Sequence, residues 1–294
     1  MNPPYSVVIA TLHRAGPLQR VLASLAAQTQ LPAATIVVDA SNDTDTQRLC
    51  AQWPGPLSVR WVPAAARSAA RQRNQGAELV ATPLVCFMDD DIEFPPDTIE
   101  KLLAPFADPA VGGVAGRISD LSHPVPRGLL WLYYRSQAGY AHPHYGGRVI
   151  GAGINLLPAF AAETDGLIAA EWLNSGLVVY RRELFDREKF PAFDGYSFLE
   201  DAHLSYRIGR THRLYFRGDA PYLHHDQPSS SDRDRRALAR KIVQHQRLFA
   251  RELQGLRGWT LAWKLTLHRL FQSIAVLRSR DPQRWRMVRG FWEA

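Results

Sequence analysis

The feature that most limits the fold is an alternation of short apolar runs with longer helical segments in the first 116 residues. The first run is rich in β-branched residues, and the runs predict buried strands at residues 6–10, 35–38, 57–62, 84–88 and 111–115. The segments between them predict helices, among them residues 15–28 and 64–80. Strands joined through helices pair in parallel, so the sequence predicts an α/β fold whose mostly parallel central sheet is flanked by helices.

The length of 294 residues has room for one large domain or two small ones. We expect one domain over residues 1–254, made of a first half (1–116) and a second half (117–254). Residues 255–294 are expected to form a basic, amphipathic helical extension. Residues 117–172 are rich in glycine, proline, histidine and tyrosine and give no clear pattern of elements.

Polar residues follow several of the predicted strands. Thr11, Asp39 and the run Asp89-Asp90-Asp91 stand at strand ends, where open parallel sheets bind their ligands. Three adjacent carboxylates repel one another, and a hard divalent cation such as Mg²⁺ or Mn²⁺ relieves that repulsion. A solvated acidic turn that caps the helix after Pro95 is the alternative interpretation.

Positive charge gathers at the end of the chain. Residues 251–294 hold nine Lys or Arg and three Asp or Glu, which is +6 of the overall net charge of +7. The same segment is rich in tryptophan, and a basic, aromatic helix is typical of one that lies in a membrane interface. A helix packed on the body with solvated arginines is the alternative, and the neutral body argues against a nucleic-acid partner.

No secretory signal and no apolar stretch long enough for a membrane span are recognised, and there are only two cysteines. We therefore expect a cytoplasmic protein that binds the inner face of the membrane peripherally through residues 255–294.

Five strings, taken in order, resemble the inverting family 2 glycosyltransferases. They are residues 6–11, Val37-Val38-Asp39-Ala40-Ser41-Asn42-Asp43, Arg71-Gln72-Arg73-Asn74-Gln75-Gly76, Phe87-Met88-Asp89-Asp90-Asp91 and Phe198-Leu199-Glu200-Asp201. The resemblance covers roughly residues 5–250. It implies the GT-A fold, with a Rossmann-like nucleotide-sugar half followed by an acceptor half. It also implies an inverting, metal-dependent transfer of a sugar from a nucleoside diphosphate sugar.

On the donor side, the resemblance assigns Asp39 to the base of the nucleotide, although Ala40 replaces the family's usual second acid. The nucleotide sugar is expected to contact Thr11, Arg14, Asp39, Arg67, Arg71, Asn74, Asp89 and Asp90. The family's D-x-D pattern matches Asp89 and Asp91, with Asp91 as the main ligand of Mg²⁺ or Mn²⁺. The further metal ligands expected are His224 and His225.

On the acceptor side, the resemblance makes Asp201 the general base, with Glu200 as the alternative. Trp172, Asn174 and Gly176 are expected to contact the acceptor, Trp172 either stacking on a sugar or filling the core. The processive members' Gln-x-x-Arg-Trp string is not found at the matching place, which predicts a single hexosyl or deoxyhexosyl transfer to a lipid-linked or polysaccharide acceptor.

Two other functions stay open. A nucleotidyltransferase has a similar sheet and acidic site, but its glycine-rich loop is not matched by Gly16 alone. A non-catalytic, membrane-associated sugar-binding protein of the same fold is the second alternative.

Overall fold

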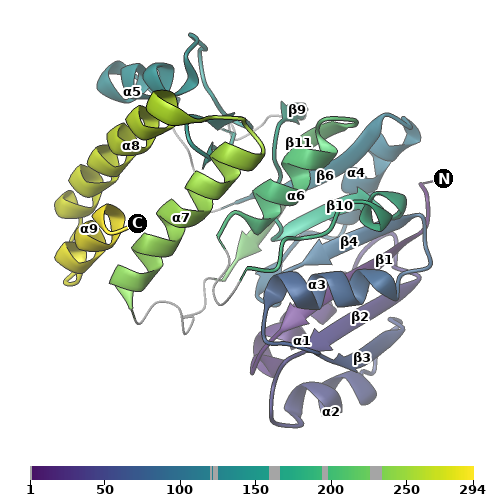
Figure 1. Ribbon diagram of the computed structural model, residues 1–294. Coiled ribbons are helices and arrows are strands. Elements are labelled where there is room, and N and C mark those ends of the chain that lie inside the picture. The colour runs from purple at the N-terminus through teal and green to yellow at the C-terminus, as the bar shows by residue number, and fades with distance from the viewer. Residues whose placement is uncertain (1, 120, 122–124, 159–165, 194–197, 226–233) are drawn as a thin grey trace. The chain divides into compact units, whose positions relative to one another are not determined.

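The structure is a computed structural model, and it describes the chain except for residues 1, 120, 122–124, 159–165, 194–197 and 226–233. The chain forms two compact units. Unit 1 consists of residues 1–123 and 158–226, and unit 2 consists of residues 124–157 and 227–294. Each unit is therefore built from two separate segments of the sequence (Figure 1).

Unit 1 is organised around one nine-stranded sheet. Its strands are β1 (Tyr5–Thr11), β2 (Ala34–Asp39), β3 (Val59–Pro63), β4 (Leu84–Met88), β5 (Ile92–Glu93), β6 (Val111–Ile118), β9 (Leu167–Ala170), β10 (Leu177–Arg181) and β11 (Arg213–His224). The strand order is β3-β2-β1-β4-β10-β6-β11-β5, and β9 also pairs with β11. The first four pair in parallel, and β10 runs antiparallel to β4 and β6 on either side of it.

Helices cover both faces of this sheet because successive side chains of a strand point to opposite faces (Figure 1). On β1, Val7 and Ile9 join the core that contains the buried face of α1. Val8 points the other way, toward Gly76 of α3. The helices of unit 1 are α1 (Ala15–Ala26), α2 (Asp45–Ala51), α3 (Ala69–Glu78), α4 (Thr98–Leu103) and α6 (Glu200–Ile208), with short 3₁₀ helices η1 (Ala104–Ala107) and η2 (Arg182–Asp186).

The predicted α/β fold with a mostly parallel sheet is confirmed, with one difference near α3. The helix expected over residues 64–80 begins only at Ala69, because the Ser68 side chain caps it by accepting a hydrogen bond from the Arg71 amide. Arg67, which falls inside the expected helix, therefore lies in the loop before α3.

Unit 2 consists of α5 (Gly128–Ala138), a hairpin of β7 (Val149–Ile150) and β8 (Ile154–Asn155), and the helices α7 (Arg235–Glu252), α8 (Gly258–Arg278) and α9 (Arg284–Trp292). The side chain of Asp234 caps α7. The division expected at residue 254 falls between α7 and α8, which belong to the same unit. The predicted extension thus shares its core with residues 124–157 and with α7.

The contact of α8 with α5 is partly polar. His268 is buried, and its two ring nitrogens face the Tyr133 hydroxyl and the side-chain amides of Gln246 and Gln272. Burial lowers the pKa of His268 to about 4, so this imidazole is neutral at physiological pH. Helix α8 of the predicted extension is therefore an integral part of unit 2.

The opposite side of α8 carries an exposed, uncharged stripe. Its members recur every three or four residues and so share one helical face: Trp259, Trp263, Thr266, Leu270, Ile274 and Leu277. Trp259 is 82% exposed and Trp263 is 50% exposed. Among the described residues, none of the helices is long and apolar enough to cross a bilayer.

Candidate active site

The predicted polar edge of the sheet is present in unit 1. Thr11 and Asp39 stand opposite each other in the parallel pairing of β1 with β2, and Ile9 stands opposite Met88 of β4. The three aspartates that follow Met88 therefore emerge beside Thr11. The last residue of β11, His224, comes to the same edge and pairs with Ile92 of β5.

Asp89, Asp91 and His224 form a group that could hold a metal ion. Nε2 of His224 lies 3.2 Å from Oδ1 of Asp91 and 3.5 Å from Oδ2 of Asp89. One ligand atom from each residue lies within 4.8 Å of the other two. His225, also expected to bind metal, is outside this group, because its Nε2 lies 2.9 Å from a carboxylate oxygen of Glu93.

The electrostatics of the group suit a cation. Hydrogen bonds to Asp89 and Asp91 raise the pKa of His224 to about 11, so the imidazole is protonated while no other cation neutralises the two acids. Burial opposes the ionisation of Asp89, but the hydrogen bond from His224 and the charge of Arg73 outweigh it and lower the pKa of Asp89. Two carboxylates and an imidazole that loses its proton are ligands that Mn²⁺ accepts, so the residues fit a divalent metal.

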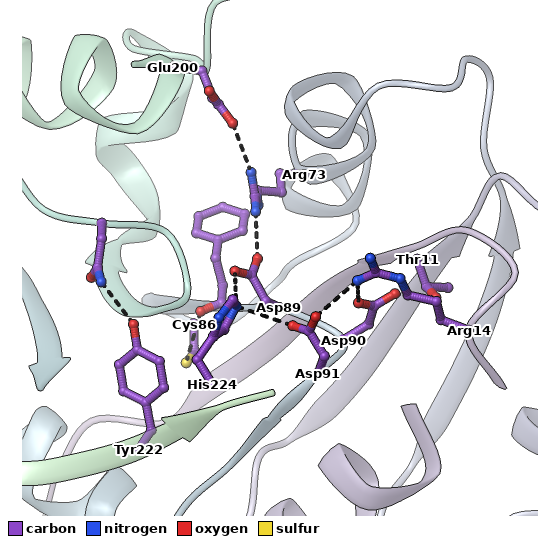
Figure 2. A network of polar contacts seen from close by, with 12 residues as sticks. Thr11, Arg14, Arg73, Cys86, Asp89, Asp90, Asp91, Glu200, Tyr222 and His224 are labelled. Atoms are coloured by element: carbon purple, nitrogen blue, oxygen red, sulfur yellow. Dashed lines mark hydrogen bonds and ion pairs between the residues drawn. The ribbon is translucent and has the colours of Figure 1, made fainter. Parts of the chain in front are cut away.

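Asp90, the middle acid of the run, has different partners. Its carboxylate accepts hydrogen bonds from the Thr11 hydroxyl at 2.7 Å and from Nη1 of Arg14 at 3.0 Å. Arg14 also donates to Oδ2 of Asp91 at 3.0 Å. Burial raises the pKa of Asp90 to about 6. Asp90 thus anchors the run to the end of β1, and the outer two acids face His224 (Figure 2).

The other residues expected on the donor side are less closely gathered. Asp39 is 3% exposed, and its carboxylate accepts hydrogen bonds from Ser41 and from the Trp61 indole at 3.0 Å. Arg67 and Arg71 are exposed on the surface. The amide of Asn74 is bonded to the backbone N–H and C=O of Phe190, at 3.0 and 2.8 Å, and so fixes that segment.

The second acidic centre opens α6. Glu200 and Asp201 are its first two residues, and they follow Leu199, a buried residue with a φ of 67°. That backbone conformation is unfavourable for a bulky L-residue, and such local strain is commonly found where a side chain must be aimed. Burial raises the pKa of both Glu200 and Asp201 above the usual carboxyl range.

Arg73 joins the two acidic centres. Its Nη2 lies 2.7 Å from Oδ1 of Asp89, and its Nη1 lies 3.5 Å from Oε1 of Glu200 (Figure 2). The sequence interpretation favoured Arg71 and missed Arg73. The available signal was that Arg73 lies three residues before Gly76, on the face of the helix that turns to the sheet.

The three residues expected to bind the acceptor have separate surroundings. Trp172 is 3% exposed and packs edge to face on Phe216, which favours the core-filling interpretation. The Asn174 amide donates to the Tyr222 hydroxyl at 2.8 Å. The carbonyl of Gly176 accepts from the Asp89 amide at 3.0 Å, and a Cβ on Gly176 would lie 2.6 Å from the same hydroxyl. Gly176 therefore lies beside Asp89, in the group that could hold a metal ion.

Part of the sequence is similar to known proteins. Residues 6–150 match the model of glycosyl transferase family 2. Validoxylamine A glucosyltransferase of Streptomyces hygroscopicus subsp. jinggangensis is 36% identical over 112 residues, which are 37% of this chain and 26% of that enzyme. The protein of the subspecies limoneus is 35% identical over 112 residues. The chain thus matches about a quarter of the length of these relatives.

Solved structures share the fold over most of the chain. The mannosyltransferase PcManGT from Pyrobaculum calidifontis, determined with GDP-mannose and Mn²⁺, superposes with a TM-score of 0.60 at 19% identity. The match covers 99% of this chain and 85% of that one. TarS from S. aureus gives a TM-score of 0.54 at 17% identity, over 94% of this chain and 44% of that one. The chain therefore has the GT-A fold, and its similarity to glycosyl transferase family 2 over residues 6–150 is consistent with a family 2 glycosyltransferase.

Proposed function

We propose that this enzyme transfers one hexosyl or deoxyhexosyl group from a nucleoside diphosphate sugar to an acceptor hydroxyl, with inversion at the anomeric carbon. The observation that carries this proposal is the proximity of two acidic centres, one with the ligands for a cation and one a buried acid pair, both in contact with Arg73. The first centre suits a diphosphate and the second suits an attacking hydroxyl.

On the donor side, Asp89, Asp91 and His224 would hold a divalent cation, Mn²⁺ or Mg²⁺. The cation would neutralise the charge that develops on the leaving diphosphate. The imidazole among the ligands favours Mn²⁺ over Mg²⁺. PcManGT, which has the same fold, was determined with Mn²⁺ and GDP-mannose, and this supports both the metal and the donor class.

On the acceptor side, Asp201 is the proposed general base. It takes the proton of the acceptor hydroxyl as the oxygen attacks the anomeric carbon, and the bond from that carbon to the diphosphate oxygen breaks. One base on the face opposite the leaving group is sufficient for a single inverting displacement. The raised pKa of Asp201 supports this role, because a base whose pKa approaches neutrality accepts a proton more readily.

A discriminating assay compares the products that each function releases. The enzyme should release nucleoside diphosphate from one of a panel of nucleotide sugars in the presence of Mn²⁺, and the same donor should raise the melting temperature. A nucleotidyltransferase would instead release pyrophosphate from a nucleoside triphosphate. Donor binding without turnover, with lipid-linked and polysaccharide acceptors supplied, would favour the non-catalytic sugar-binding protein.

We further propose that unit 2 binds the inner, anionic face of a membrane, where a lipid-linked acceptor would be available. By sequence, unit 2 holds 18 Lys or Arg and 5 Asp or Glu, a net charge of +13, whereas unit 1 holds 17 and 23, a net charge of −6. Each basic side chain near an anionic surface contributes about 1 kcal/mol. The exposed tryptophans of the α8 stripe would add an apolar contribution that salt does not screen.

Flotation with vesicles tests this association. The full chain should bind phosphatidylserine-containing vesicles at low salt and partly at high salt, and the double substitution Trp263→Ser, Leu270→Ser should remove the salt-resistant part. Leu79→Ser, an exposed apolar residue of unit 1, is the matched control and should leave binding unchanged. A protein that dimerises through the stripe and ignores the vesicles would contradict the proposal.

A further inference from the structure

Arg73 contacts both acidic centres from a buried position. Arg73 is 5% exposed. Its guanidinium lies between the carboxylates of Asp89, at 2.7 Å, and Glu200, at 3.5 Å (Figure 2). The charge of Asp201 also acts on this guanidinium. One cation therefore balances three carboxylates, one directly after β4 and two at the start of α6, which are more than 100 residues apart in the sequence.

The surroundings leave Arg73 little freedom. Gly76, in the next turn of α3, lies so close to β1 that a Cβ there would be 2.3 Å from Cγ1 of Val8. This approach brings the helix onto the sheet. The guanidinium is also stacked over the ring of Phe190, 5.6 Å from its centroid, and both backbone groups of Phe190 are held by Asn74. Arg73 is therefore fixed from the side of the sheet and from the side of the Phe190 segment.

The two oxygens of Asp89 have separate partners. Oδ1 accepts the hydrogen bond from Arg73, and Oδ2 is the oxygen that lies 3.5 Å from His224. An outer partner that binds one oxygen of a ligating carboxylate orients the other oxygen toward the metal. Arg73 thus sets the direction in which Asp89 presents Oδ2 toward His224.

The contact with Glu200 is incomplete as it stands. Nη1 and Nε of Arg73 are buried and make no hydrogen bond among the described residues, and the 3.5 Å separation from Glu200 is an ion pair without a hydrogen bond. A buried donor without a partner costs free energy, and contacts of this kind tighten when the substrate completes the site.

We propose that Arg73 is the positioning residue that fixes the acid pair relative to the metal-binding group. Through Asp89 it orients a metal ligand, and through Glu200 it holds the start of α6, so that Asp201 faces the anomeric carbon of the bound donor. The contact between Nη1 and Glu200 shortens to a hydrogen bond when the donor is bound. This inference rests on the proposed sugar transfer.

The geometry requires arginine and not merely a positive charge. The guanidinium is a planar fork whose two terminal nitrogens reach separate carboxylates, whereas the single nitrogen of lysine reaches one of them. Arg73→Lys should therefore keep the charge and lose the bridge. Because a displacement of about 1 Å costs about 100-fold in rate, we expect kcat to fall about 10–100-fold while the KM for the donor changes less than about threefold.

A double-mutant cycle with Glu200→Gln tests whether Arg73 acts through Glu200. If it does, the double variant should be no slower than the slower single variant, because the second change removes a contact already lost. Rate losses that multiply, or an Arg73→Lys variant within threefold of the wild type, would overturn the proposal. Arg181→Lys is the control for a general loss of stability, because Arg181 donates hydrogen bonds to backbone carbonyls and pairs with the first residue of β4, away from the site. The kcat of this variant should equal that of the wild type.

Metal binding gives a readout that does not depend on turnover. Removal of a positive charge beside Asp89 would by itself tighten Mn²⁺ binding, whereas loss of orientation should weaken it about 10–100-fold. Electron paramagnetic resonance of the free ion measures Mn²⁺ binding by Arg73→Met. Weaker binding than by the wild type supports the positioning role of Arg73, and equal or tighter binding overturns it. If the wild type transfers no sugar, the proposed function fails and this measurement still decides the role of Arg73.

Discussion

The substitution Asp201→Asn tests the proposed general base. In the structure, Oδ1 of Asp201 accepts a hydrogen bond from the Ala202 amide at 2.7 Å, and the oxygen of an asparagine can accept the same bond. The variant should therefore fold normally and bind the donor. Because an amide cannot take the acceptor proton, transfer should fall about 10²–10⁴-fold.

The same substitution should raise the stability. Burial raises the pKa of Asp201 in the folded protein, so the ionised carboxylate opposes folding. That penalty is absent below the pKa of the unfolded chain, near 4, and is complete above the higher pKa of the folded state. Each step of one in pKa corresponds to about 1.4 kcal/mol, so Asp201→Asn should gain about 1–3 kcal/mol at pH 8 and nothing at pH 4.

Calorimetric melting at the two pH values measures this gain, which should appear as a rise of roughly 2–10 °C at pH 8. Asp219→Asn is the control of opposite sign, because the hydrogen bond from Arg217 lowers the pKa of Asp219. It should not raise the melting temperature, and it should leave transfer unchanged. If Asp201→Asn transfers sugar within threefold of the wild-type rate, Asp201 is not the general base. A lower melting temperature at pH 8 would mean that attraction to Arg73 outweighs the cost of burial.

Three further results are expected. Asp91→Ala should abolish Mn²⁺-dependent nucleotide binding in titration calorimetry, whereas His225→Ala, which alters a residue outside the metal-binding group, should change the affinity less than about threefold. The rate of transfer at saturating donor should fall tenfold per pH unit on the acid side. The midpoint should lie above about pH 5, because burial raises the pKa of Asp201, the proposed base; a midpoint near pH 4 would contradict that burial. Gly76→Ala should destabilise the protein by about 1–3 kcal/mol in urea unfolding, because its Cβ would meet Val8 at 2.3 Å, and an unchanged midpoint would show that α3 moves freely.

The polar edge could be predicted from sequence because its signals are local. An apolar run followed by aspartate marks a strand end, and parallel pairing brings such ends together. Which two of the three aspartates lie beside His224 could not be read from these local signals, although the D-x-D pattern of the resemblance named Asp89 and Asp91. That choice depends on Thr11 and Arg14, which lie almost 80 residues earlier and bind the middle acid.

The position of Arg73 between the two acidic centres was missed because the face of α3 that is buried is set by a contact with the sheet. The sequence suggested a helix from residue 64, but the cap at Ser68 moved its start, and the contact of Gly76 with the sheet determined the buried face. Residues 117–172 were unreadable for another reason. Their packing partners lie far along the chain, as with Tyr133 and His268, so no local pattern reports them.

The place of β10 in the sheet has a consequence for biosynthesis. This strand lies between β4 and β6, yet the ribosome makes it after both of them and after residues 124–157. Until residue 181 has emerged, β4 offers an unpaired edge of five apolar residues, and such an edge can pair with other chains. A fragment that ends at residue 150 would keep that edge permanently. We therefore expect it to aggregate on expression, although it contains the whole segment that matches the family.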